Sequence, residues 1–179
     1  MQACVSTVRQ KVQRVEHHLS RWWYLGFFLI ALLVVAADQL TKMWIRAYSG
    51  AQPIFKIGFF RIIHVQNSGA AFGLFHDQNF ILAIVAFIGI ILILFFVFYV
   101  SRRYPVWSSG PGTLALGLVM GGTGGNLVDR LSRGYVTDFI DVGAWPTFNV
   151  ADSAVTVGII LFACSLLYLS HKAEASKGQ

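Results

Sequence analysis

The chain has 179 residues, of which 56% are hydrophobic and 12% are charged, and its mean hydropathy is +0.63. These values exclude an ordinary soluble domain and predict a single polytopic membrane domain. The formal net charge of +6 favours anchoring to anionic lipid, and nucleic-acid binding is disfavoured because no basic cluster coincides with a soluble module.

The N-terminal residues 1–21 are polar and basic, and we expect a cytoplasmic tail or surface helix there. An apolar run follows, which predicts the first membrane span over residues 22–42. The apolar run is not typical of a cleaved signal peptide. It is followed by Asp38 and Lys42 at helical spacing, and not by a small-residue cleavage site. An acid four residues before a base favours an ion pair on a helix, and we expect one here.

The next region, residues 46–75, is expected to form an extracytoplasmic β structure. Residues 53–66 are rich in β-branched and aromatic types, with Gly58 in the middle, which predicts one or two strands or a small hairpin-like sheet. Such a sheet is amphipathic and would rest on the outer leaflet. The alternative is a simple linker between spans. A turn-forming run of small residues, 67–73, follows.

Three further spans are predicted at residues 80–100, 113–131 and 152–170. The first of these contains no charge and is long enough to cross about 30 Å of hydrocarbon. The span over 113–131 is rich in glycine at four-residue spacing, which predicts close helix packing. A lesser possibility is that these glycines keep a groove open for a substrate helix. They are Gly117, Gly121 and Gly125.

Four spans place both chain ends on the same side of the membrane. The short loop with Arg102 and Arg103 lies on that side as well, so the positive-inside rule predicts cytoplasmic termini and external polar loops. The predicted organisation is therefore one four-helix domain over residues 22–171, followed by a short cytoplasmic tail over 172–179.

Two aspartates, Asp138 and Asp152, flank the polar loop before the last span. Asn149 is a good helix N-cap, and Asp152 would then lie in the first helical turn, where the helix dipole favours the ionised carboxyl. The apolar neighbours of Asp138 favour its protonated form. One ionised and one protonated carboxyl side by side can activate water and polarise a carbonyl. Spacing alone is equally compatible with two structural acids, and Asp141 competes for membership of the pair.

A second polar group lies at the end of the glycine-rich span. Asn126 and Arg130 share a helix face, while Asp129 is a possible third acid for which a structural role is favoured. Zinc-protease and serine-hydrolase motifs are absent from the sequence, so no metal or other cofactor is expected.

Five motifs, in the same order over roughly residues 25–170, resemble those of lipoprotein signal peptidase (signal peptidase II). They lie at residues 38–42, 67–72, 121–131, 136–141 and 145–153. The resemblance implies a mainly α-helical membrane aspartyl endopeptidase of the plasma (inner) membrane, with four transmembrane helices. It also implies a small extracytoplasmic β-sheet resting on the membrane, a short extracytoplasmic helix, and an active site near that face.

The same resemblance implies the substrate, a prolipoprotein whose cysteine already carries diacylglycerol, cut just before that cysteine. By motif position Asp138 and Asp152 would be the catalytic pair, which removes Asp141 and Asp129 from it. The other motif residues would bind substrate or support the site: Asn67, Gly69, Asn126, Asp129, Arg130, Asn149 and Ala151, with Asp38 and Lys42 as a structural ion pair. A monomer in contact with membrane lipids would suffice, and inhibitors of the globomycin type would bind at the dyad.

Three rival hypotheses are weaker. A proton- or ion-coupled carrier is expected to show related halves, and the two pairs of spans are not similar. A non-catalytic scaffold packed through the glycine-rich span leaves the surroundings of Asp138 and Asp152 unexplained. A protease of the presenilin type would contain a Gly-x-Gly-Asp sequence, which is absent from the chain.

Overall fold

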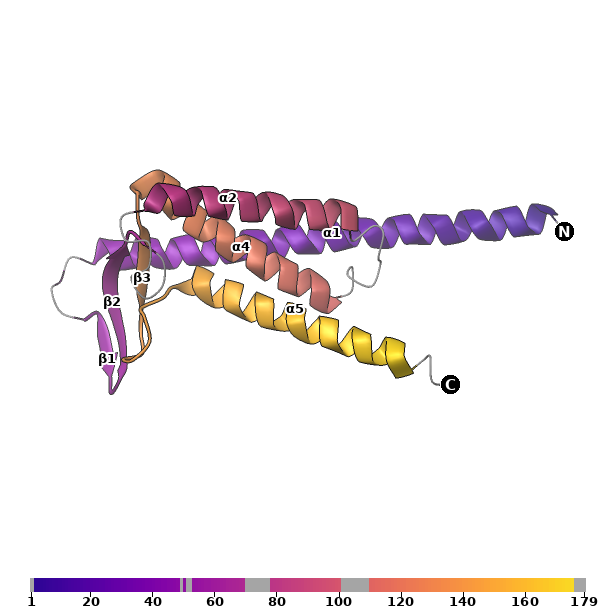
Figure 1. Ribbon diagram of the computed structural model, residues 1–179. Coiled ribbons are helices and arrows are strands. Elements are labelled where there is room, and N and C mark those ends of the chain that lie inside the picture. The colour runs from indigo at the N-terminus through magenta and orange to yellow at the C-terminus, as the bar shows by residue number, and fades with distance from the viewer. Residues whose placement is uncertain (1, 49, 51–52, 70–77, 101–109, 176–179) are drawn as a thin grey trace.

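The computed structural model describes residues 2–48, 50, 53–69, 78–100 and 110–175. Within them, long helices stand side by side and a three-stranded sheet lies across one end (Figure 1). The helical elements are α1 (Gln2–Ala47), α2 (Asn79–Phe95), its π-helical continuation η2 (Phe96–Val100), α4 (Gly110–Arg133) and α5 (Val150–Ala175). The strands are β1 (Phe55–Ile57), β2 (Phe60–Asn67) and β3 (Val136–Asp141).

Three segments of the described residues are long and apolar enough to cross a membrane. They are Trp22–Ala47, Asn79–Tyr99 and Val150–Tyr168, close to three of the four predicted spans. The predicted span over 113–131 corresponds to α4, whose hydropathy is lowered by glycine and by the polar residues at its end. Residues 2–21 were expected to be a tail or surface helix. They continue α1 without a break, and α1 extends well past the other helices (Figure 1).

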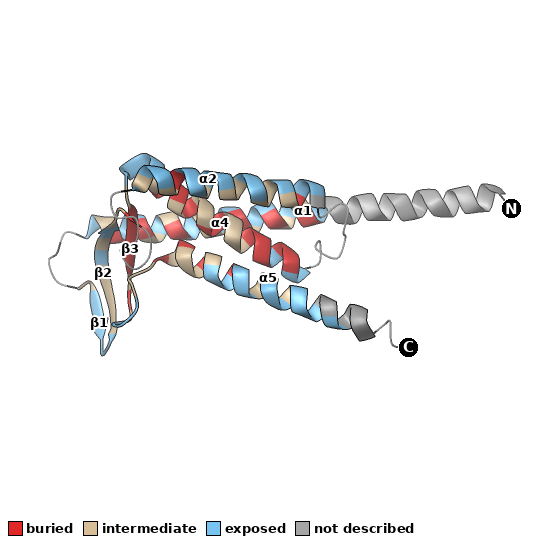
Figure 2. Cartoon of the chain, viewed as in Figure 1, coloured by how far each residue is buried: buried red, intermediate tan, exposed pale blue. Residues whose placement is uncertain are grey.

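Helix α4 lies at the centre of the bundle and packs against α1, α2 and α5 (Figure 2). Its glycines allow this close approach. A Cβ on Gly121 would lie 2.6 Å from Val34 Cβ of α1, and one on Gly122 would lie 2.4 Å from the carbonyl oxygen of Ala151 in α5. Both separations are below van der Waals contact. The predicted close packing of the glycine-rich helix is confirmed.

This packing predicts a difference between two neighbouring glycines. Gly122→Ala is expected to destabilise the protein by about 1–3 kcal/mol, because the added methyl group would displace the backbone of α5. Gly124→Ala is the matched control, since its Cβ would meet only Val35 Cγ2 at 3.4 Å, an ordinary contact. Thermal unfolding of both variants in detergent measures the difference. Equal midpoints would contradict the proposed role of Gly122 in the α4–α5 contact.

The predicted hairpin is also confirmed. Strands β1 and β2 are antiparallel and meet at a turn in which Gly58 has a φ of +54°, a conformation that glycine adopts without strain. Strand β3 pairs with the other edge of β2, which places Asp138 opposite Val65. The sequence did not predict that the segment around Asp138 belongs to this sheet.

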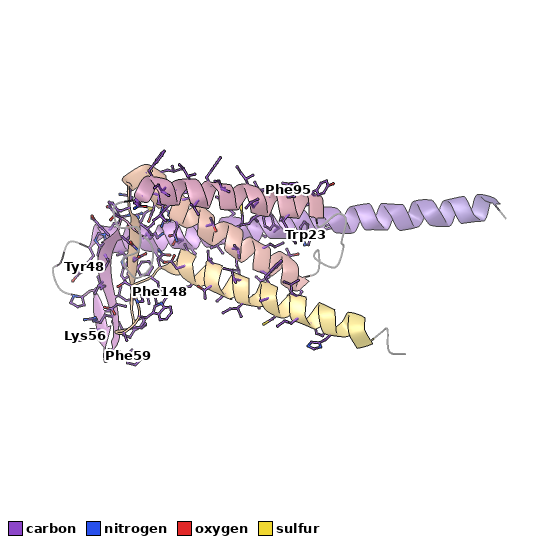
Figure 3. The ribbon with its side chains drawn as sticks, viewed as in Figure 1. Trp23, Tyr48, Lys56, Phe59, Phe95 and Phe148 are labelled. Atoms are coloured by element: carbon purple, nitrogen blue, oxygen red, sulfur yellow. The ribbon has the colours of Figure 1, made fainter. Side chains whose placement is uncertain are left out.

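Apolar side chains of the hairpin remain exposed at the end of the molecule. Phe59 and Lys56 lie at its tip, far from Trp23, which packs with Phe27 at the opposite end of the bundle (Figure 3). The expected short extracytoplasmic helix has no counterpart among the described residues between α1 and α2 or between α4 and α5. Residues 70–77, which connect β2 to α2, lie outside the described residues.

Candidate functional site

The two predicted dyad aspartates come from different elements at the sheet end of the bundle. Asp138 lies in the middle of β3 and is buried, with 3% of its surface exposed. Asp152 lies in the first turn of α5 and is half-buried. The sheet pairing of β3 and the start of α5 therefore position the two carboxyl groups independently.

Asparagine side chains connect these carboxyl groups. Asn149 Nδ2 donates to Asp138 Oδ1 at 2.7 Å and to Asn126 Oδ1 at 3.1 Å. Asn126 Nδ2 in turn donates to Asp152 Oδ1 at 2.7 Å. From β2, Asn67 Nδ2 donates to Asp138 Oδ2 at 2.8 Å. The two acids thus belong to one hydrogen-bonded unit drawn from β2, β3, α4 and the start of α5.

The start of α5 is a reciprocal capping arrangement. The Asp152 amide donates to Asn149 Oδ1 at 2.9 Å, and the Asn149 amide donates to Asp152 Oδ2 at 3.1 Å. This satisfies backbone donors that the helix itself leaves free. The predicted N-cap role of Asn149 is confirmed. Because Asn149 is fully buried and also contacts Asp138, the same residue ends the loop and fixes one side of the site.

The environment of Asp138 favours its protonated form. Burial raises the pKa of the Asp138 carboxyl to about 6, and the negative charge of Asp152 adds to the rise. The hydrogen bonds from Asn67 and Asn149, and the charge of Lys42, oppose it by stabilising the carboxylate. A carboxyl that titrates near neutrality is suited to donate and accept protons in a reaction.

Lys42 lies at the centre of a buried ionic cluster beside the asparagines. Its ammonium group is 2.8 Å from Asp38 Oδ2 and 3.2 Å from Asp129 Oδ2, and all three side chains are fully buried. The same ammonium donates to Asn126 Oδ1 at 2.9 Å. The predicted Asp38–Lys42 pair is confirmed, but it is one part of a larger network that reaches the site. With Lys42 and Asn149 both donating to the Asn126 carbonyl oxygen, the Asn126 amide nitrogen is directed at Asp152.

Asp129 connects α4 to the beginning of β3. Its Oδ2 accepts from the Thr137 amide at 3.0 Å, and its Oδ1 lies 3.3 Å from Arg46, which also donates to Thr137 Oγ1 at 3.1 Å. Gln39 contributes a further hydrogen bond to Asp129 Oδ1 at 3.3 Å. These contacts fix the residue that precedes Asp138. The sequence favoured a structural role for Asp129, and these contacts are consistent with it. Its cationic partners are Lys42 and Arg46 of α1.

Three further residues of this network, Gln39, Arg46 and Thr137, were not predicted from the sequence. Arg46 follows Asp38 and Lys42 at four-residue spacing, so a polar stripe along α1 was the signal available for it. Nothing in the local sequence marks Thr137, whose role depends on β3 lying beside α4.

Asp141 lies apart from the dyad. It forms an ion pair with Arg61 of β2, and its Oδ1 accepts from the Gly143 amide at 2.8 Å. Because successive strand residues point to opposite faces, Asp138 and Asp141, three residues apart, face opposite sides of β3. Asp138 therefore belongs to the asparagine network, whereas Asp141 contacts Arg61 of the hairpin.

The remaining predicted residues border the network. Arg130 Nη2 is 3.5 Å from the carbonyl oxygen of Gly69, whose amide donates to Asn67 Oδ1 at 3.0 Å. The Ala151 amide donates to Asp38 Oδ1 at 3.1 Å. Residues 70–73, the rest of the turn-forming run, lie outside the described residues.

Comparison with known proteins shows similarity to a single family. A family model described as Signal peptidase (SPase) II matches residues 30–168. A lipoprotein signal peptidase of Dehalococcoides mccartyi is 45% identical over 148 residues, which are 82% of this chain and 92% of that protein. One from Moorella thermoacetica is 40% identical over 143 residues, which are 79% and 92% of the two chains.

Solved structures share the fold. Two, both described as a bacterial membrane enzyme structure by the in meso method, have TM-scores of 0.71 and 0.67 and identities of 32% and 33%. Each match covers 79% of this chain, and 87% and 92% of the solved chains. The chain therefore belongs to the signal peptidase II family, the lipoprotein signal peptidases, which are bacterial membrane enzymes that hydrolyse peptide bonds.

Proposed function

We propose that this protein cuts diacylglyceryl-modified prolipoproteins just before the lipidated cysteine, with a water molecule activated between Asp138 and Asp152. The observation that carries the proposal is the asparagine network, which unites these two carboxyl groups at one end of the bundle. Paired carboxyl groups that share a proton are the chemical requirement of an aspartic protease.

The proposed reaction needs no cofactor. The Asp152 carboxylate takes a proton from the water as the water oxygen attacks the scissile carbonyl. The protonated Asp138 donates its proton to the carbonyl oxygen. As the tetrahedral intermediate collapses, its hydroxyl returns a proton to Asp138, the C–N bond breaks, and the departing amine takes up the proton that Asp152 had removed from the water. The pKa of about 6 at Asp138 supports its role as the proton donor in this scheme.

The surrounding residues have supporting roles in the proposal. Asn67, Asn126 and Asn149 hold the two carboxyl groups, and Asp129 fixes the start of β3. The backbone around Gly69, together with Arg130, borders the space beside the dyad where the peptide would bind. The Asp38–Lys42 pair supports the site from α1, and Ala151 links Asp38 to α5.

In the membrane, we place α4 as the fourth span, with both termini in the cytoplasm and the sheet on the extracytoplasmic side. Helix α1 begins, and α5 ends, at the end of the bundle away from the sheet (Figure 1). The exposed apolar residues of the hairpin, among them Phe59, are suited to rest on the outer leaflet. The dyad would then lie near the outer membrane face, where a substrate anchored by its acyl chains and a globomycin-type inhibitor would reach it.

The position of the cut tests the proposal directly. Purified enzyme in detergent is expected to release a lipoprotein whose first residue is the diacylglyceryl cysteine, as measured by mass spectrometry. The same precursor without its diacylglyceryl group is the control and should be cut far more slowly. Cleavage at another bond, or equal cleavage of both precursors, would contradict the proposed specificity.

The pKa of Asp138 predicts the pH dependence. If Asp138 donates a proton, kcat/KM should fall as the pH rises through about 6, because the required protonated form is lost. Asn67→Ala should move this alkaline limb to higher pH, since it removes a hydrogen bond that stabilises the carboxylate. A pH–rate profile of both proteins measures the shift. A limb that moves to lower pH in the variant would contradict the assignment.

A further inference from the structure

Helix α1 carries a seam of apolar and small residues with alternating spacings of three and four. This is the a and d pattern of a heptad repeat, and it is unbroken along the helix. The segment over residues 2–21 is rich in charged residues, yet every charge lies outside the seam. The seam consists of Val5, Val8, Val12, Val15, Leu19, Trp22, Gly26, Leu29, Leu33, Ala36, Leu40, Met43 and Ala47.

Where the side chains of α1 are described, every seam residue except Gly26, which faces Thr113 of α4, is exposed. The bundle buries a different face of the helix, which includes Phe27, Lys42 and Ile45. Seam residues on the outer side are exposed, among them Trp22 at 67% and Leu40 at 64%. An apolar outer face is ordinary within a bilayer. A heptad pattern that continues through a polar segment is not required for membrane insertion, and it indicates a helical partner.

The charges beside the seam identify that partner. Two copies inserted in one membrane have the same orientation, so their α1 helices are parallel. In a parallel pair, each g position faces the e position of the next heptad in the partner helix. The register assigns Lys11 to g and Glu16 to the following e, so opposite charges meet in both directions.

We propose that two copies of this chain associate through a parallel coiled coil of their α1 helices, with its polar part formed by residues 2–21. This departs from the monomer expected from the sequence. Residues 2–21 lie before the family match, which begins at residue 30. Each copy contains its own Asp138 and Asp152, so the association concerns a surface separate from the site.

Cysteine cross-linking in native membranes tests the pairing. The full chain is used with Cys4→Ser and Cys164→Ser, and one cysteine is introduced at a time. Val15→Cys, at a d position, is expected to give a disulfide-linked dimer on mild oxidation. His17→Cys, at an f position two residues away, is the matched control and should remain monomeric. Equal cross-linking at the two positions, or none at Val15→Cys, would overturn the proposal.

Charge exchange tests the parallel register. In the Val15→Cys background, Lys11→Glu places two acids opposite each other, and we expect the dimer fraction to fall several-fold. Adding Glu16→Lys restores opposite charges and should restore cross-linking. A double variant that remains as weak as the single one would overturn the assigned register, as would a single variant that cross-links as well as the parent.

Discussion

Replacing either Asp138 or Asp152 with asparagine is expected to lower the turnover of a diacylated prolipoprotein by about 10³-fold or more. Asparagine keeps the size of the side chain, but it can neither take a proton from water, as proposed for Asp152, nor donate one to the carbonyl oxygen, as proposed for Asp138. It also disturbs the network, because both oxygens of each carboxyl group accept hydrogen bonds from asparagine nitrogens, and an amide supplies only one such oxygen. Cleavage by purified enzyme in detergent measures the effect.

Asp141→Asn is the matched control for this experiment. It changes a buried acid on the same strand, but one that pairs with Arg61 outside the asparagine network. We expect Asp141→Asn to cut far faster than either dyad variant, provided that all three proteins unfold at comparable temperatures. Near wild-type cleavage by Asp138→Asn or Asp152→Asn would refute the proposed dyad. Chelator should leave wild-type activity unchanged, since the proposed reaction uses no metal ion.

Lys42→Met is expected to have the largest effect on stability, about 3–5 kcal/mol. Methionine has a similar length but no charge, so Asp38 and Asp129 would lose a shared buried cation. Removing one partner from a buried ionic cluster leaves uncompensated charge, which costs more than the cluster contributed. Asn126 would also lose one of the two donors that orient it toward Asp152. We therefore expect lower activity in the protein that remains folded.

Lys56→Met is the control for Lys42→Met, because Lys56 lies on the exposed strand β1 and has no such cluster around it in the described residues. Thermal unfolding in detergent should show a large decrease in the midpoint for Lys42→Met and little change for Lys56→Met. If the two variants unfold at the same temperature, the cluster does not stabilise the bundle as proposed.

Local sequence patterns predicted much of this molecule, because the features concerned depend on near neighbours. The apolar runs predicted three spans that the structure contains, and Gly58 between two β-rich stretches predicted the hairpin. Asn149 three residues before Asp152 gave the capping arrangement at the start of α5. The cap and the hairpin follow from spacing within one helical turn or one hairpin, and each span follows from the composition of a single segment.

Such local patterns could not predict the contacts between segments that are distant in the sequence. Strand β3 pairs with β2 some seventy residues earlier, and no local signal specifies that pairing over another. For the same reason, the sequence did not indicate that Lys42 and Arg46 of α1 are the cationic partners of Asp129. The resemblance to a known family pointed to Asp138, Asp152 and the three asparagines, and the folded chain shows which carboxyl oxygens these asparagines contact.

The Asp38–Lys42 pair has a consequence for biosynthesis. A single charge in the hydrocarbon region is costly, and Asp129, the third member of the cluster, lies in a helix made much later in synthesis. Asp38 and Lys42 are one helical turn apart, so α1 neutralises its own buried charges without help from any other segment. The first helix can therefore leave the translocation channel for the bilayer while α4 is still to be translated.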